Sequence, residues 1–138
     1  MLKNSLGKTG YVGERRNFTT RTYVSVPTGN WFGMGELVRL ESGVWTLYAR
    51  LDCNDAISGL ERVGAAISTN NDTGTGGVLE DGKALSIFAT DSEGVIGPIL
   101  PATVNISVAT SYYGKALALG SASSTITVYG YAIRIALK

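Results

Sequence analysis

Apolar and polar residues alternate along most of this chain, a pattern that favours strands over helices. The clearest case is GVWTLYARLDC, residues 43–53. One face of this segment carries Trp45, Leu47, Ala49, Leu51 and Cys53. The other face carries Thr46, Tyr48, Arg50 and Asp52. A strand with one apolar and one polar face belongs to a sheet buried on one side, so the segment predicts a two-layer β structure.

Further segments show the same alternation, and clusters rich in Gly, Asn, Asp and Ser separate them. The predicted strands are 22–26, 35–40, 43–53, 62–69, 83–90, 103–110, 112–119 and 124–137. Eighteen glycines in 138 residues fit many short connections, because glycine supplies the positive φ that tight turns require. The sequence therefore predicts an all-β fold: an antiparallel β-sandwich of the jelly-roll type with eight to nine strands.

The last predicted strand has apolar residues at both parities. Ile126 and Val128 share one parity, whereas Tyr131, Ile133, Ile135 and Leu137 share the other. A β-bulge at Gly130 is predicted to switch the inward face; without a bulge, both faces are apolar. Either arrangement places this strand inside a sheet, because an exposed edge of this composition aggregates.

Length and charge predict one domain with a basic leader. Charged residues make up 17% of the chain, against roughly 25% in average soluble domains. Residues 1–21 hold five basic residues and one acidic residue, whereas the remainder is mildly acidic. The predicted organisation is a basic N-terminal arm over 1–21 and a single jelly-roll domain over 22–138. The arm lies either across an acidic neighbour or free in solvent.

Several functional classes find no support in the residues. The chain has no histidine, which removes the usual general base and the commonest transition-metal ligand, so no enzyme activity is predicted. The DCND and NNDTG segments lack the spacing of a calcium loop, so no cofactor or metal is expected. Cys53, the only cysteine, is predicted to be a buried hydrophobe.

Partners and location are predicted from charge and hydropathy. The formal net charge of +1 does not indicate nucleic acid, and no apolar run approaches the ~20 residues of a membrane span. The first ten residues lack the apolar core of a secretory signal. The chain is expected to fold in a cytoplasm or to leave it as part of a larger particle.

Four segments together resemble a known family. They are LESGVWTLYARLD (40–52), RVGAAISTNND (62–72), TVNISVATSYYGKALAL (103–119) and STITVYGYAIRIALK (124–138). Their order is similar to that in tumour-necrosis-factor-like jelly rolls of bacteriophage virion proteins, over roughly residues 36–138. The resemblance implies a self-associating jelly roll, usually a trimer, with a mechanical role in a virion.

Under this resemblance we expect a capsid decoration or cement protein, a homotrimer that binds the major capsid protein or neighbouring virion proteins. Contact with the capsid is expected through Arg15, Arg16, Arg21, Trp31 and Phe32. Contact between subunits is expected through Tyr129, Tyr131, Ile133, Ile135 and Leu137.

The alternative is a receptor-binding knob of a tail fibre that recognises host-surface glycans. The candidate aromatic platform for a sugar consists of Tyr112 and Tyr113 with Tyr129 and Tyr131, and the knob is predicted to recognise its glycan through Tyr112, Tyr113 or the loop 70–77. Packing between strands or between subunits is the other predicted role of these tyrosines. The chain has no repetitive shaft of the kind that carries fibre knobs, which favours the decoration protein.

Overall fold

A computed structural model describes residues 9–53, 60–72, 84–89, 95–120 and 124–137. The strands are β1 (Arg15–Asn17), β2 (Arg21–Val26), β3 (Trp31–Leu40), β4 (Gly43–Cys53), β5 (Leu60–Ser68), β6 (Ala84–Ala89), β7 (Val95–Ile106), β8 (Thr110–Gly120) and β9 (Ser124–Ala136). No helix occurs in the described ranges, so none of them holds a helical membrane span.

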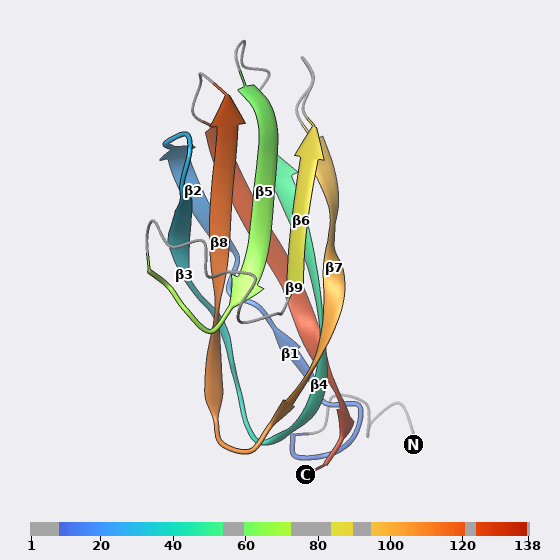
Figure 1. Cartoon of the computed structure of the whole chain (residues 1–138). Coiled ribbons are helices and arrows are strands. Elements are labelled where there is room, and N and C mark those ends of the chain that lie inside the picture. Colours follow the sequence, from blue (N-terminus) through green and yellow to red (C-terminus); the bar gives the residue numbers. More distant parts are fainter. Residues whose placement is uncertain (1–8, 54–59, 73–83, 90–94, 121–123, 138) are drawn as a thin grey trace.

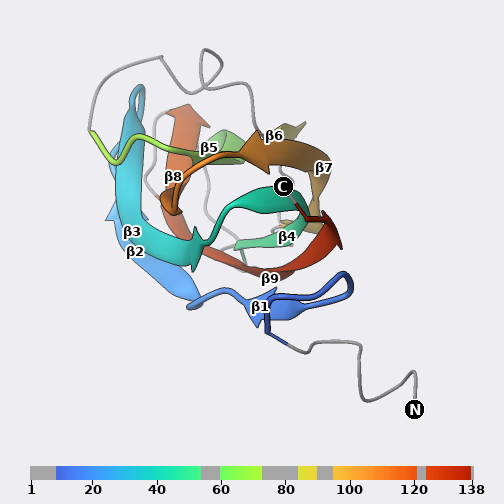
Figure 2. The same ribbon diagram turned by 90° about the horizontal axis from the view of Figure 1, so that it is seen from below.

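The strands form two antiparallel sheets that pack face to face (Figures 1 and 2). The first sheet has the order β1–β9–β4–β7, with β2 also paired to β9. The second sheet has the order β3–β8–β5–β6. From β2 to β5 and from β6 to β9 successive strands alternate between the two sheets, whereas β1 and β2, and likewise β5 and β6, lie in the same sheet. This is a jelly-roll order, and the predicted fold class is confirmed.

The start of the first sheet differs from the prediction, because two short strands follow the same edge of β9. β1 pairs with Tyr131–Ile133, and β2 pairs with Ser124–Val128. Between them the Phe18 amide donates to the Gly130 carbonyl at 2.9 Å, and the Phe18 side chain is buried in the core. Residues 15–18 of the segment predicted as a basic N-terminal arm therefore pair with β9 in the first sheet. The division of the chain into an arm over 1–21 and a domain over 22–138 stays a prediction.

Other strand boundaries also moved. β3 begins at Trp31 rather than at residue 35, and the predicted strand 103–110 is the end of β7 followed by a turn and the first residue of β8. Predicted turns at 54–59 and 91–94 lie outside the described residues.

The predicted inward face of β4 is confirmed. Trp45, Leu47, Leu51 and Cys53 have no solvent exposure, and Ala49 is also buried. They pack against residues of the second sheet such as Leu37, Ile67 and Tyr112 within one core cluster. The Cys53 thiol lies 2.7 Å from the Ser124 hydroxyl, so this cysteine is a core residue, as predicted.

The predicted bulge at Gly130 is wrong. Tyr129, Gly130 and Tyr131 pair in unbroken register with Arg50, Ala49 and Tyr48. The inward parity of β9 continues through Ile126, Val128 and Ala132 to Arg134, which is also buried. The second apolar set therefore lies on the outer face of the sheet, as the no-bulge alternative describes.

Gly130 instead allows the backbone of β9 to lie close to the backbone of β4. A Cβ at this position would lie 2.0 Å from the Tyr48 carbonyl oxygen and 2.8 Å from the Ala49 Cα. Gly114 of β8 is less constrained, because a Cβ there would meet the flexible side chains of Met34 and Leu37 at 3.3 Å or more.

We predict that Gly130→Ala destabilises the fold by about 2–4 kcal/mol, because β9 must move away from β4. Gly114→Ala is the matched control and is expected to cost about 1 kcal/mol or less. Urea unfolding followed by tryptophan fluorescence measures both. Equal stability of the two variants would show that the approach at Gly130 relaxes without cost.

Candidate functional site

A buried ion cluster fixes the end of β9. The Arg134 Nε lies 3.2 Å from a Glu14 carboxylate oxygen, and the Arg134 Nη1 donates to the Ser42 carbonyl at 2.6 Å. The Arg134 guanidinium also lies over the Trp45 ring, 4.5 Å from its centroid. Glu14 is 1% exposed and Arg134 is 5% exposed. The pair thus closes this end of the core with polar groups that are satisfied internally.

Glu14 has further partners that hold it ionised. It accepts from the Arg16 Nε at 2.5 Å and from the Gly10 amide at 2.8 Å. Burial raises the pKa of Glu14, but the hydrogen bonds from Arg16 and Gly10 and the charges of Arg16 and Arg134 outweigh burial. The net pKa lies below its ordinary value of 4.5, so the carboxylate is charged at neutral pH.

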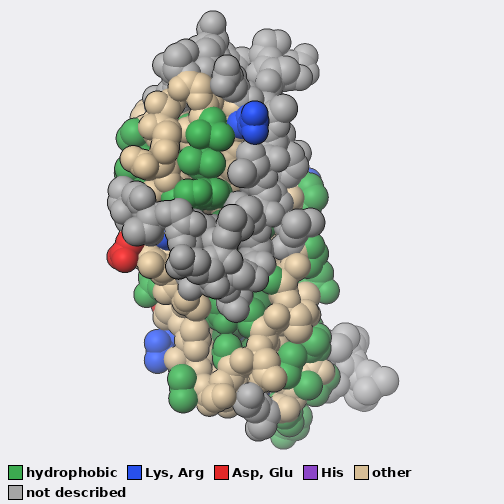
Figure 3. All heavy atoms as spheres, in the orientation of Figure 1, with side chains coloured by type: hydrophobic (Ala, Val, Ile, Leu, Met, Phe, Trp, Pro, Cys, Tyr) green, Lys and Arg blue, Asp and Glu red, His purple; other side chains and the backbone are tan. Residues whose placement is uncertain are grey.

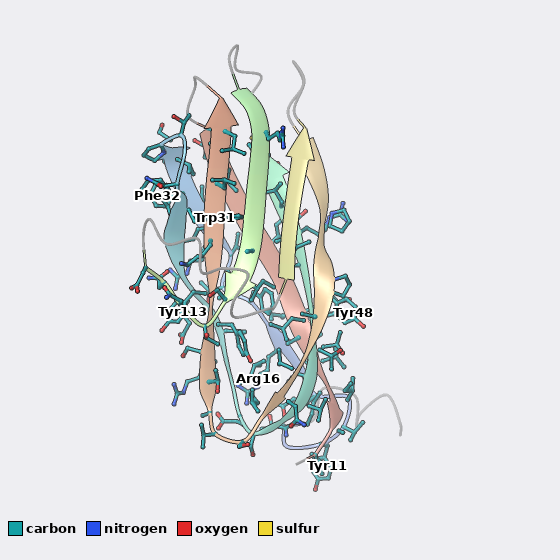
Figure 4. All side chains as sticks on the ribbon, in the orientation of Figure 1. Tyr11, Arg16, Trp31, Phe32, Tyr48 and Tyr113 are labelled. Carbon is teal, nitrogen blue, oxygen red and sulfur yellow. The ribbon has the colours of Figure 1, made fainter. Side chains whose placement is uncertain are left out.

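Large apolar side chains are exposed beside this cluster. The Gly13 amide donates to the Arg134 carbonyl at 2.7 Å, which sets the turn before β1 against the end of β9. The exposed residues are Tyr11 (51%), Val12 (54%), Ile135 (47%) and Leu137 (56%). We call these four residues the β9-end patch; Figure 4 shows Tyr11 at this end of the sandwich. Ile133, the other isoleucine predicted at the subunit interface, is half-buried on the same face of β9.

The three arginines predicted to contact the capsid each bind a group within the fold. Arg16 is bound to Glu14, and the Arg21 Nε donates to the Glu36 carbonyl at 2.7 Å. Arg15 is exposed; its Nε donates to the Asn17 side chain at 2.9 Å, and its guanidinium lies 4.0 Å from the centroid of the Tyr131 ring. Of the three, Arg15 therefore presents most of its guanidinium to a partner.

The two predicted aromatic contacts of β3 are both half-buried. Phe32 packs against the core, and its ring centroid lies 5.5 Å from that of Tyr23. Phe32 thus contributes to the packing of the fold, whereas Trp31 is not among the residues packed against the core cluster. Figure 4 shows Phe32 and Tyr48 on opposite sides of the view.

Tyr129 and Tyr131 line a groove on the outer face of the first sheet, a feature that sequence reasoning missed. The groove has a volume of about 490 Å³. Its lining residues are Arg15, Thr20, Tyr48, Ala49, Arg50, Pro98, Ile99, Pro101, Tyr129, Gly130 and Tyr131. We call it the tyrosine groove. The alternation in the sequence already placed Tyr48 and Arg50 on the outer face of the sheet. Which residues of β7 lie beside them depends on the strand register, which the sequence alone does not give.

The predicted sugar contacts do not form a joint site. Tyr112 is 1% exposed and belongs to the core, where burial raises the pKa of its hydroxyl, so its predicted role in binding sugar is wrong. Tyr113 lines a shallow hollow with Thr69, Asn70, Asn71 and Asp72. Residues 73–77 of the predicted loop lie outside the described part of the chain. Within that part, no three acidic or thiol groups converge on a metal position.

The outer face of the second sheet has a different character in the residues that the structure describes. Figure 3 shows hydrophobic side chains gathered over β5 and β8, with few charged side chains around them. Lys115 of β8 is fully buried, and its Nζ has no hydrogen-bond partner in the part of the chain that the structure describes. Among the described residues of this face, we identify no arrangement of side chains suited to binding a ligand.

No protein-family model matches the sequence, and no curated protein sequence matches it at a significant level. Similar solved structures include a chain of sacbrood virus of honeybee, 9% identical, covering 87% of this chain and 66% of that chain, with a TM-score of 0.46. A pentameric capsid protein from metagenomic phage sequences is 14% identical, with 99% and 72% covered and a TM-score of 0.35.

A third similar structure is the C-terminal CBM6 of LamC, a marine laminarinase from Zobellia galactanivorans. It is 13% identical, with 91% of this chain and 95% of that chain covered and a TM-score of 0.31. Similarities this low say nothing about what the present chain binds or does.

We predict that Glu14→Gln lowers the stability at pH 7 by about 3 kcal/mol, because the buried Arg134 loses its counter-charge. The lowered pKa of Glu14 stabilises the native state above pH 4.5, and this contribution is lost as the pH falls below 4.5. The variant should therefore lose less stability than the wild type between pH 5 and pH 3. Urea unfolding at several pH values measures this, with the exposed Glu41→Gln as the control. An unchanged acid response in Glu14→Gln would contradict the role of the cluster.

Proposed function

We propose that the chain is a structural protein of a virus particle, a decoration or cement protein that binds the capsid exterior as a homotrimer. The observation that supports it most is the β9-end patch, with four large apolar side chains about half exposed on adjoining segments. Exposed clusters of this kind mark sites of association. The sequence resemblance to tumour-necrosis-factor-like virion jelly rolls supports the same role.

The patch is suited to symmetric contact because it lies on a rigid element. Backbone hydrogen bonds join residues 13 and 14 to Arg134, and the buried ion pair fixes their side chains. Val108, 72% exposed, belongs to the connection between β7 and β8, which lies at the same end of the sandwich (Figure 1). Little conformational entropy is lost when a preformed surface binds, which favours repeated contacts in a shell.

The proposed subunit interface consists of Ile133, Ile135 and Leu137 together with Tyr11 and Val12. Tyr129 and Tyr131, also predicted to lie there, line the tyrosine groove further along β9. For the capsid contact we retain Arg15, which is the exposed arginine of the predicted set, and Trp31, which is half-buried.

The wild-type chain is expected to sediment at three times its 14.5 kDa mass. Ile135→Asp should give a folded monomer, because the new charge lies on the monomer surface but would be buried unpaired between subunits. Val24→Asp, at a valine of β2 that is 70% exposed against 47% for Ile135, is the control and should stay trimeric. A monomeric wild type, or a trimeric Ile135→Asp variant, would contradict the proposed interface.

Attachment to capsids tests the second half of the proposal. Arg15→Glu should reduce co-sedimentation of the chain with shells of the virus that encodes it by roughly tenfold, because a charge is reversed at the contact. The solution mass of the variant should not change. Attachment equal to that of the wild type would remove Arg15 from the capsid contact.

A further inference from the structure

The tyrosine groove combines an aromatic platform with cationic groups. The rings of Tyr48 and Tyr131 lie 5.3 Å apart between centroids, with an interplanar angle of 31°. Ala49 and Ile99 are buried beneath the groove, and Pro98 and Pro101 are exposed along β7. The volume of about 490 Å³ falls within the range of small-ligand sites. The groove is thus open, largely apolar and formed by regular strands.

Two arginines give the groove its charge. The Arg15 Nε donates to the Asn17 side chain, and the guanidinium is stacked on the Tyr131 ring. These contacts hold the arginine in place and leave its two terminal amino groups available to a ligand. Arg50 is exposed, and no side chain in the described part of the chain pairs with it. No Asp or Glu is among the lining residues. A guanidinium fork held this way suits a planar carboxylate.

We propose that the tyrosine groove binds an acidic saccharide. The apolar face of a pyranose ring would stack on Tyr48 and Tyr131, and Arg15 and Arg50 would bind its carboxylate. Of the four tyrosines predicted as a sugar-stacking platform, Tyr129 and Tyr131 line this groove, whereas Tyr112 and Tyr113 do not. It goes beyond the assembly role and depends on no subunit contact.

The surroundings of the groove favour a saccharide over single-stranded nucleic acid. Nucleic-acid grooves continue as a basic track that follows the phosphates. The outer face here continues instead into hydroxyl pairs: Thr22 with Thr127 at 2.8 Å, and Thr46 with Thr103 at 3.1 Å. Beyond Tyr131 the same strand presents Ile133 and Ile135. One acidic residue of a hydroxyl-rich ligand matches this pattern.

The test uses the purified full chain on an array of uronate- and sialate-bearing oligosaccharides beside their neutral counterparts, followed by calorimetry with the strongest binder. Acidic members should bind at least about tenfold more tightly than neutral ones, with affinity falling as salt rises. Tyr48→Ala should weaken binding about tenfold by removing the stacking platform. Arg50→Gln, an exposed substitution that leaves the core intact, should abolish the preference for the acidic members.

The control is Arg39→Gln, an exposed arginine of β3 in the other sheet, which should bind like the wild type. The inference is overturned if no saccharide binds, if Arg39→Gln weakens binding as much as Arg50→Gln, or if a single-stranded oligonucleotide binds more tightly than every saccharide. The solution mass of Tyr48→Ala and Arg50→Gln should equal that of the wild type. If the chain proves not to be a trimer, the saccharide measurements still test the groove. If no saccharide binds, the solution mass still tests the trimer.

Discussion

The ion pair between Glu14 and Arg134 determines how both ends of the described chain are placed. Without Glu14, the inward parity of β9 would bury an uncompensated arginine against Trp45, at a cost of several kcal/mol. With it, β9 passes Gly130 in unbroken register with β4, and its second apolar parity faces outward. The outward set then divides into two surfaces, the tyrosine groove along the middle of β9 and the β9-end patch at its end.

These two surfaces have different physical characters. The patch is apolar and lies on rigid backbone, which suits a second copy of the chain or another protein. The groove has positive charge, aromatic faces and neighbouring hydroxyl groups, which suits a small anionic ligand. Association between subunits and binding of a saccharide would then use separate parts of one sheet, whereas Arg15 belongs both to the groove and to the proposed capsid contact.

The sequence was sufficient to predict the structure wherever the burial of a residue follows from the alternation of apolar and polar residues alone. The inward face of β4, the number of strands and the jelly-roll order follow from period-2 patterns and turn residues. The β1 strand has no such pattern, because Arg-Arg-Asn contains no apolar residue, although its backbone pairs with β9. The bulge at Gly130 was expected because the apolar residues of this strand change parity there, whereas the parity that stays inward ends on Arg134. Its partner Glu14 is 120 residues away, and no local pattern reveals such a pair. The groove was missed for a similar reason, since it joins residues of β1, β4, β7 and β9.

Amide hydrogen exchange of β9 at low and high protein concentration tests the central claim most directly. The amide of Arg134, bonded to the Glu14 carbonyl at 2.9 Å, should exchange slowly at both concentrations. Amides of residues 135–137 and of the turn at 11–13 should gain protection as the concentration rises and copies associate. Rapid exchange at Arg134, or protection of the patch that does not depend on concentration, would contradict the account.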